Sequence, residues 1–303
     1  MKQIKIIHSF WSEPTLEVHE KLANDTGLKR RSGGWLNKKY NYLSWALSCL
    51  TIRKIYDQVE LVTDARGKSL LIDKLELPYT HVSVELDKLD GQNIELWATA
   101  KLLAYKIQKE PFLHLDSDVY LWKPFSDEII TAGLVAQNPE NDFESYKNIW
   151  RQVLNGFEHI PSYITDDFKK EGIIRACNAG VFGGSDINFL HDFAEKALAF
   201  LKSNEDNFNR VNLGYSVLIY EQYLFAAYSR SKQKAISYLF NEVSSDYREL
   251  IDFKNVPKIS NFIHTVGGVK AKQSICDSVE RRLLLEYPDY YYRINKLLCD
   301  QII

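Results

Sequence analysis

Two aspartates, Asp116 and Asp118, stand at the end of an apolar stretch in the segment FLHLDSDVYLWKPF, residues 112–125. Residues two apart in an extended chain point the same way, so we expect the two carboxylates to converge. Converging carboxylates repel each other unless a cation lies between them, and hard ions such as Mg²⁺ and Mn²⁺ prefer oxygen ligands. The natural task of such a site is to hold a nucleotide diphosphate. The alternative interpretation is a solvated turn with a helix cap.

A second segment, FIHTVGGVK at 262–270, offers groups that suit the same ligand. The imidazole of His264 can complete a carboxylate metal site, and it shifts the preference from Mg²⁺ toward Mn²⁺. Gly267 lets the backbone approach a phosphate closely, and Lys270 offers a positive charge to it. A purely structural histidine is the alternative for His264.

A third segment, CNAGVFGG at 177–184, has the character of a buried strand with room for a ligand at its edge. Asn178 can donate and accept hydrogen bonds, while Ala179 and Gly180 leave space beside the strand. Lys101 lies on a helix just before the acidic strand, where its ammonium can reach a nucleotide bound at the aspartates. A tight turn and a solvated lysine are the alternatives.

The elements that must carry these residues alternate between strands and helices, as in parallel α/β units. We expect strands at 3–7, 59–63, 81–84, 111–116 and 177–184, and helices at 41–55, 67–74, 96–107 and after Asp186. The polar stretch 137–176 contains Pro139 and Pro161, which predicts helices and loops laid over the sheet and facing the substrate. We find no linker between independent domains, which favours one α/β domain with C-terminal additions.

The amino-acid composition limits the kinds of partner that the protein can bind. The 303 residues carry 38 Lys+Arg against 40 Asp+Glu, so the net charge of −2 lacks the basic field that nucleic-acid binding requires. The four cysteines form no C-x-x-C pair, which argues against a zinc knuckle or a disulfide framework. We find no apolar run long enough to span a membrane and no secretory signal pattern, so we expect a cytoplasmic protein.

The motifs, taken in chain order, resemble those of the glycogenin and lipopolysaccharide galactosyltransferase-like glycosyltransferases. They are Lys101, LHLDSDVYLWKPF, CNAGVFGG, YEQYLF at 220–225 and His264-x-x-Gly267-x-x-Lys270. The resemblance implies an α/β fold of the GT-A type, with a mixed, mainly parallel sheet flanked by helices and a C-terminal helical extension. It implies a glycosyltransferase domain over 1–275 and a helical tail over 276–303. The implied activity is Mn²⁺- or Mg²⁺-dependent transfer of a hexose from a nucleotide sugar, most often a UDP-sugar, with retention of configuration.

The resemblance also assigns roles to single residues. Asp116, Asp118 and His264 correspond to the metal ligands. The expected donor-binding residues are His8, Ser9, Tyr42, Asp64, Lys101, Ser117, Asn178, Ala179, Gly180, Gly267 and Lys270. Glu221 and Gln222 take the place of an acidic residue and a glutamine near the reacting sugar, and they are the expected catalytic residues.

Two other functions fit parts of the pattern. The segment DSDVY also resembles the motif of haloacid-dehalogenase-type phosphatases, whose first aspartate is a nucleophile, but that motif normally lies on the first strand. A non-catalytic nucleotide- or carbohydrate-binding module of the same fold is the other alternative.

The expected partners are a nucleotide-sugar donor and a glycan, lipid-linked or protein acceptor, as in polysaccharide biosynthesis. The basic loop 29–39 is either a clamp for phosphate or an anionic acceptor, or a solvated loop. The basic and aromatic tail either rests on the inner face of a membrane or packs on its own domain or a second subunit. The sequence carries no indication of the oligomeric state.

Overall fold

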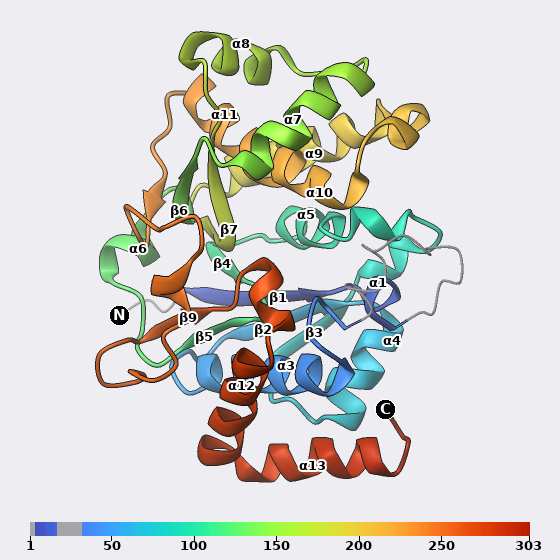
Figure 1. Ribbon diagram of the computed structural model, residues 1–303, viewed down its shortest axis with the longest axis vertical. Helices are drawn as coiled ribbons and strands as arrows, with labels where there is room; N and C mark the ends of the chain where they lie inside the picture. The colour runs from blue at the N-terminus through green and yellow to red at the C-terminus, as the bar shows by residue number, and fades with distance from the viewer. Residues whose placement is uncertain (1–3, 17–31) are drawn as a thin grey trace. The chain divides into compact units, whose positions relative to one another are not determined.

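The chain divides into two compact units. The computed structural model describes residues 4–16 and 32–303, so Lys29, Arg30 and Arg31 of the basic loop lie outside the described residues. The first unit consists of Met1–Asp90, Leu115–Pro124 and Tyr247–Ile303, and the second of Gly91–His114 and Phe125–Asp246. Figure 1 shows the order of the elements along the chain. The proposed division into a domain over 1–275 and a tail over 276–303 stays a prediction.

The first unit contains three parallel strands and a short antiparallel ribbon. The parallel strands are β1 (Lys5–Phe10), β2 (Val59–Thr63) and β3 (His81–Val84), in the order β3-β2-β1. The ribbon pairs β5 (Val119–Leu121) with β9 (Phe262–His264). β1 and β2 are largely buried, whereas the edge strand β3 is not.

Helix α3 (Lys38–Arg53) is the central helix of the first unit, and every residue from Tyr40 to Ile52 is buried. Asn37 begins it by accepting a hydrogen bond from the amide of Lys39. The unit's other helical segments are α1 (Glu13–Leu16), α4 (Ala65–Lys68), the π-helix η1 (Ser69–Lys74), the 3₁₀ helices η2 (Leu86–Leu89), η6 (Arg248–Leu250) and η7 (Gly267–Ala271), α12 (Gln273–Glu286) and α13 (Pro288–Cys299).

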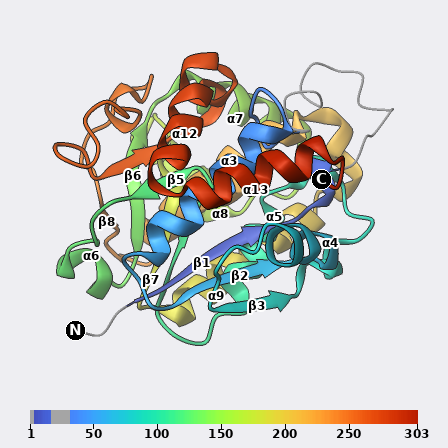
Figure 2. The ribbon, with the colours of Figure 1, turned by 90° about the horizontal axis from the view of Figure 1, so that it is seen from below.

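The C-terminal helices α12 and α13 pack against α3, as Figures 1 and 2 show. The side chains of Ile275, Val279, Leu283 and Ile294 are buried in the same apolar cluster as the inner face of α3. Lys39 forms an ion pair with Glu280 at 2.7 Å, and the indole of Trp122 donates to Glu286 at 3.0 Å. The tail therefore packs on its own unit, as one of the two sequence-based alternatives stated.

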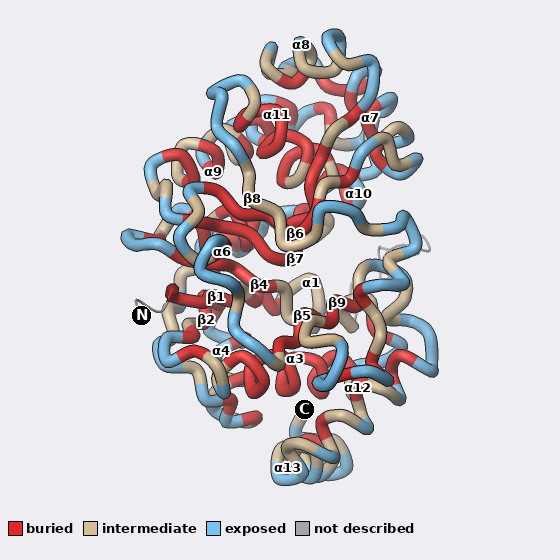
Figure 3. Tube along the Cα trace, turned by 90° about the vertical axis from the view of Figure 1, so that its left-hand side faces the viewer, coloured by how far each residue is buried: buried red, intermediate tan, exposed pale blue. Residues whose placement is uncertain are grey.

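The second unit combines parallel and antiparallel pairing. Its strands are β4 (Phe112–Leu115), whose last residue belongs to the first unit, β6 (Val135–Asn141), β7 (Arg175–Gly184) and β8 (Ser237–Tyr238), in the order β4-β7-β6-β8. β6 pairs antiparallel with β7 and parallel with β8, and Figure 3 shows both β6 and β7 as largely buried. Its helical segments are η3 (Ile94–Leu96), α5 (Thr99–Lys106), α6 (Asp127–Thr131), α7 (Glu144–Gly156), α8 (Ser162–Glu171), α9 (Ile187–Lys202), the 3₁₀ helix η4 (Glu205–Arg210), α10 (Leu213–Val217), the π-helix η5 (Leu218–Tyr223) and α11 (Leu224–Ser231).

The predicted fold class is confirmed: the protein is α/β, with mixed, mainly parallel strands, flanking helices and a C-terminal helical part. The prediction for 137–176 is wrong at its beginning, because residues 135–141 form strand β6 rather than a loop. Pro139 misled the prediction because proline cannot donate to a β-ladder. In the structure Pro139 lies opposite Cys177 in the pairing of β6 with β7, and the register shifts between Ala136 and Asn138.

Among the described residues, no helix has both the length and the apolar character that crossing a membrane requires.

Candidate functional site

Asp116 and Asp118 lie in a tight turn that follows β4 and leads into β5. The amide of Val119 donates to the carbonyl of Asp116 at 3.0 Å, which closes the turn. The strand ends at Leu115, so the expected convergence of the two aspartates is confirmed, but its expected cause, an extended backbone, is wrong. The turn brings their side chains together instead.

His264 reaches this turn through the antiparallel pairing of β5 with β9. In that register Val119 lies opposite His264, and the amide of Thr265 donates to the carbonyl of Asp118 at 3.1 Å. Short antiparallel pairing therefore places a residue from late in the chain directly beside the acidic turn.

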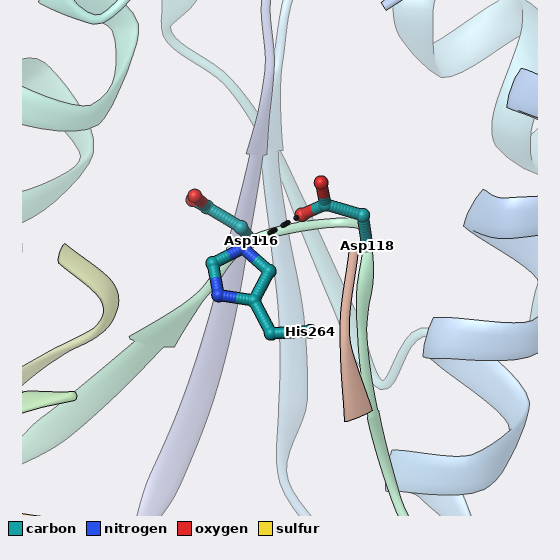
Figure 4. A group of neighbouring side chains, drawn as sticks. All are labelled: Asp116, Asp118 and His264. Atoms are coloured by element: carbon teal, nitrogen blue, oxygen red, sulfur yellow. Dashed lines mark ion pairs between the residues drawn. The ribbon is translucent and has the colours of Figure 1, made fainter. Parts of the chain in front are cut away.

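The side chains of Asp116, Asp118 and His264 form one cluster (Figure 4). One potential ligand atom from each lies within 4.8 Å of the other two, and His264 Nε2 is 3.4 Å from Asp118 Oδ1. Asp118 and His264 are buried, and Asp116 is half-buried. Two carboxylates and one imidazole are a donor set that fits Mn²⁺, or Mg²⁺ with less preference, so the residues present suit the metal that the sequence implies.

Lys270 lies on the other side of Asp118. Its Nζ is 2.8 Å from Asp118 Oδ2, and it belongs to the 3₁₀ helix that begins at Gly267 with φ of +58°. Burial by itself raises the pKa of the Asp118 carboxyl, but the attraction of Lys270 and His264 outweighs it and holds the pKa below its usual value. Asp118 is therefore an ionised, buried carboxylate with a positively charged neighbour.

The loop before α3 also contacts Lys270. Gly34 has φ of +85°, and a Cβ at that position would lie 3.3 Å from Lys270 Cε. Glycine therefore suits this position for two reasons, its left-handed backbone and the close approach of the lysine side chain.

His8 and Tyr42 are expected donor-binding residues of the first unit, and both are buried. His8 is fully buried; its Nδ1 is 2.7 Å from the hydroxyl of Tyr79 and its ring meets Trp45 edge to face. Burial lowers the pKa of His8 to about 3, against a smaller opposing effect of Asp118, so the imidazole is neutral at neutral pH. Tyr42, on α3, is also buried, and burial raises its pKa.

Three other expected donor-binding residues of the first unit lie on β1, at the end of β2 and in the acidic turn. Asp64 accepts hydrogen bonds from the amides of Ser12 and Gly67, each at 2.6 Å, and thereby caps α4. Ser9 lies on β1 and Ser117 lies between the two aspartates. The donor-binding roles of these residues stay predictions.

The second unit contains the remaining predicted residues. Lys101 on α5 is buried, and its Nζ lies 3.3 Å from Oε1 of the fully buried Glu221. The hydroxyl of Tyr105 donates to the same oxygen at 2.9 Å. Glu221 and Gln222 lie on the π-helix η5, an irregularity that is frequent at functional sites. The structure thus brings Lys101 and Glu221 together as an ion pair.

The segment Asn178-Ala179-Gly180 lies within β7, where the Asn178 side chain accepts from the amide of Gly180 at 2.9 Å. The same side chain donates to Glu140 Oε1 on β6, also at 2.9 Å. The hydroxyl of Tyr146 lies in hydrogen-bond contact with both Glu140 and Gln222.

Sequence reasoning missed Glu140. This buried carboxylate lies between Asn178 and Tyr146, but it follows Pro139 in a stretch interpreted as a loop. The apolar run Leu134–Ala136 was the only local sign that a strand begins there.

Comparison with known proteins identifies a family. No curated protein matches the chain significantly in sequence. Two solved structures of the glycosyltransferase GlyE from Streptococcus pneumoniae TIGR4, one of them the apo form, are 9% identical with a TM-score of 0.43. These alignments cover 99% of this chain and 64% of the GlyE chain, so the protein spans less than two thirds of that chain's length. A protein family described as a family of unknown function (DUF6734) matches residues 4–297. Because this match covers nearly the whole sequence, the protein belongs to this family of unknown function.

Proposed function

We propose that the protein is a metal-dependent glycosyltransferase that takes a sugar from a nucleotide-sugar donor. The observation that carries the proposal is the convergence of Asp116, Asp118 and His264 within 4.8 Å, with the ammonium of Lys270 beside Asp118. The order of the motifs along the sequence supports the same conclusion. Asp116, Asp118 and His264 would hold the metal.

A divalent cation bound at this cluster supplies positive charge that offsets the charge developing on a leaving diphosphate. The chain itself contributes a second positive charge through Lys270, whose ammonium has three donors and uses one toward Asp118 at 2.8 Å. The burial of Asp118 and His264 keeps water away from part of the cluster, which strengthens electrostatic interactions there.

We assign the binding of the sugar to Lys101, Asn178, Glu221 and Gln222. Asn178, held by Glu140, would bind sugar hydroxyls, and Lys101 would contact the donor. Glu221 would stabilise positive charge on the reacting sugar, with Gln222 beside it. Transfer of a hexose with retention of configuration is the outcome that the resemblance favours.

We propose UDP as the nucleotide and Mn²⁺ as the metal, with a glycan, lipid-linked or protein acceptor, as in polysaccharide biosynthesis. The imidazole in the donor set supports Mn²⁺ over Mg²⁺. The assignment of UDP rests on the resemblance of the motifs.

Thermal unfolding in the presence of UDP-, GDP-, CMP- and dTDP-sugars, each with and without Mn²⁺, tests the proposal. A ligand that binds the native state raises the unfolding temperature, so the donor is the nucleotide sugar that raises it only when Mn²⁺ is present. Asp118→Asn should abolish that rise. The control is Asp186→Asn, which alters an aspartate that caps α9 and belongs to the second unit.

Metal-dependent stabilisation together with release of the sugar supports the proposal, and NMR of the anomeric proton in the product tests retention. Stabilisation without release over long incubation indicates a non-catalytic binding module instead. Hydrolysis of a phosphate monoester with a phosphoryl group trapped on Asp116 indicates the phosphatase. Absence of any metal-dependent shift contradicts the proposal.

A further inference from the structure

Helix α3 presents three hydroxyl side chains on one buried face. Ser44, Ser48 and Thr51 are separated by four and three residues, so they lie above one another on the helix surface. All three are buried within a helix whose other buried residues are mostly apolar. Buried hydroxyls need hydrogen-bond partners. Ser44 and Ser48 donate to the acidic turn and β5, whereas Thr51 donates to the carbonyl of Leu47 within the helix.

The three hydroxyls meet alternate residues of the segment 117–121. Ser44 Oγ donates to the carbonyl of Ser117 at 2.9 Å, and Ser48 Oγ donates to the carbonyl of Val119 at 2.7 Å. The amide of Leu121 donates to Thr51 Oγ1 at 3.4 Å. The helix therefore holds the backbone immediately before and after Asp118.

Each serine hydroxyl has one proton and can donate only one hydrogen bond, which determines the donor and the acceptor in each contact along this face. Ser44 donates its only hydroxyl proton to Ser117, so it must accept from the hydroxyl of Tyr120, 2.8 Å away. Ser48 likewise donates to Val119, so its contact with His8 Nε2 at 3.4 Å requires the imidazole to donate. His8 Nδ1 then accepts from Tyr79. Each serine is thus held in one orientation by a second hydrogen bond.

Asp118 is also held from the opposite side. The amide of Thr265, which follows β9, donates to the carbonyl of Asp118 at 3.1 Å. The backbone that carries the metal ligands is therefore fixed between α3 and β9. Side chains that hold metal ligands in place contribute to affinity without touching the metal.

We infer that Ser44 and Ser48 are positioning residues for the metal site, which they orient through the backbone of the acidic turn. The inference rests on the proposed metal site but not on sugar transfer. Neither serine is a metal ligand, and neither was singled out by the sequence motifs. Their role predicts a loss of metal affinity that exceeds any general loss of stability.

Calorimetric titration of the full-length protein with Mn²⁺ alone tests the inference. Removing both hydroxyls in the Ser44→Ala/Ser48→Ala variant should weaken Mn²⁺ binding by about tenfold or more, as for other residues that support metal ligands. Ser48→Thr keeps the hydroxyl and should retain most of the affinity. The matched control is Thr63→Val, which removes a buried hydroxyl bond of 2.7 Å to the carbonyl of Phe10, a bond in the same unit that involves no residue of the turn.

Thermal unfolding of each variant without metal separates positioning from stability. We expect Thr63→Val to lose stability but to keep its Mn²⁺ affinity. The single variants Ser44→Ala and Ser48→Ala should each lose Mn²⁺ affinity, and they serve as the test if the double variant is too unstable to titrate. Equal Mn²⁺ affinity in the serine variants and the wild type overturns the inference and leaves the proposed function intact. A wild-type protein that binds no Mn²⁺ overturns both.

Discussion

At the scale of single residues, the environment of each ionisable group decides what it can do. The two oxygens of Asp118 face different partners, His264 at 3.4 Å and the ammonium of Lys270 at 2.8 Å. His8 is fully buried in a neutral hydrogen-bonded chain with Tyr79 and Ser48. The surroundings of Asp118 suit cation binding, whereas those of His8 stabilise the fold.

The neutral state of His8 predicts a pH-dependent stability. Its pKa falls from 6.5 to about 3 on folding, so between these values the unfolded chain binds a proton that the folded protein does not. The contribution of neutral His8 to the free energy of unfolding is therefore fully present above pH 6.5 and is lost as the pH falls toward 3. Through this group, the free energy of unfolding should fall by about 2 kcal/mol between pH 7 and pH 5.

Urea unfolding at several pH values, in the wild type and in His8→Gln, measures this contribution. Glutamine can keep a hydrogen bond to Tyr79 or Ser48 but does not titrate, so the variant should lose less stability on acidification. Effects of all other groups cancel in the comparison. An identical pH dependence in the two proteins would show that His8 is not held neutral.

At the scale of elements, apolar pattern and turn signals were enough for most of the fold. Strands 59–63 and 81–84 were predicted with the bounds that the structure gives, because each is a short β-rich run between polar residues. Strand β6 was missed because Pro139 lies inside it. The hydrogen bonds of Ser44, Ser48 and Thr51 with the segment 117–121 were not predictable either, since that segment lies about 70 residues further along the chain.

The glycine turn that ends β7 gives a prediction about packing within the second unit. Gly183 has φ of +143°, and a Cβ there would lie 2.2 Å from the carbonyl oxygen of Phe112 on β4. Gly183→Ala should therefore lower the free energy of unfolding by about 3 kcal/mol or more, through backbone strain and a clash with rigid backbone.

The control for this prediction is Gly133→Ala. The added Cβ at Gly133 has no neighbouring atom within 4 Å, so its effect should stay within about 0.5 kcal/mol. Chemical denaturation measures both variants. Equal stability of the two variants would mean that β7 does not pack against β4 as described.

At the level of the whole molecule, each compact unit is assembled from segments that are far apart in the sequence. The first unit takes three separate segments and the second takes two, so the sequence offers no single linker between them. The three candidate metal ligands could be named from the sequence because the D-x-D and His-x-x-Gly-x-x-Lys motifs are local. Their meeting depends on the pairing of β5 with β9, which no local pattern encodes.

Hydrogen exchange tests whether these distant segments act together. Mn²⁺ with UDP should slow amide exchange in Val119–Leu121 and Phe262–His264 at the same time, because a ligand held by both strands stabilises their pairing. Helix α8 in the second unit carries none of the predicted site residues and is the internal reference. Protection of only one of the two strands would contradict a shared site.

We propose that Asp116, Asp118 and His264 form one divalent-metal site, and titration of the protein with Mn²⁺, followed by electron paramagnetic resonance, tests this directly. We expect the wild-type protein to bind a single Mn²⁺ per chain. Asp116→Asn/Asp118→Asn and His264→Gln should each lose it, while Thr63→Val should bind it normally. A wild-type protein that leaves Mn²⁺ free in solution, or variants that bind it as tightly as the wild type, would contradict the claim.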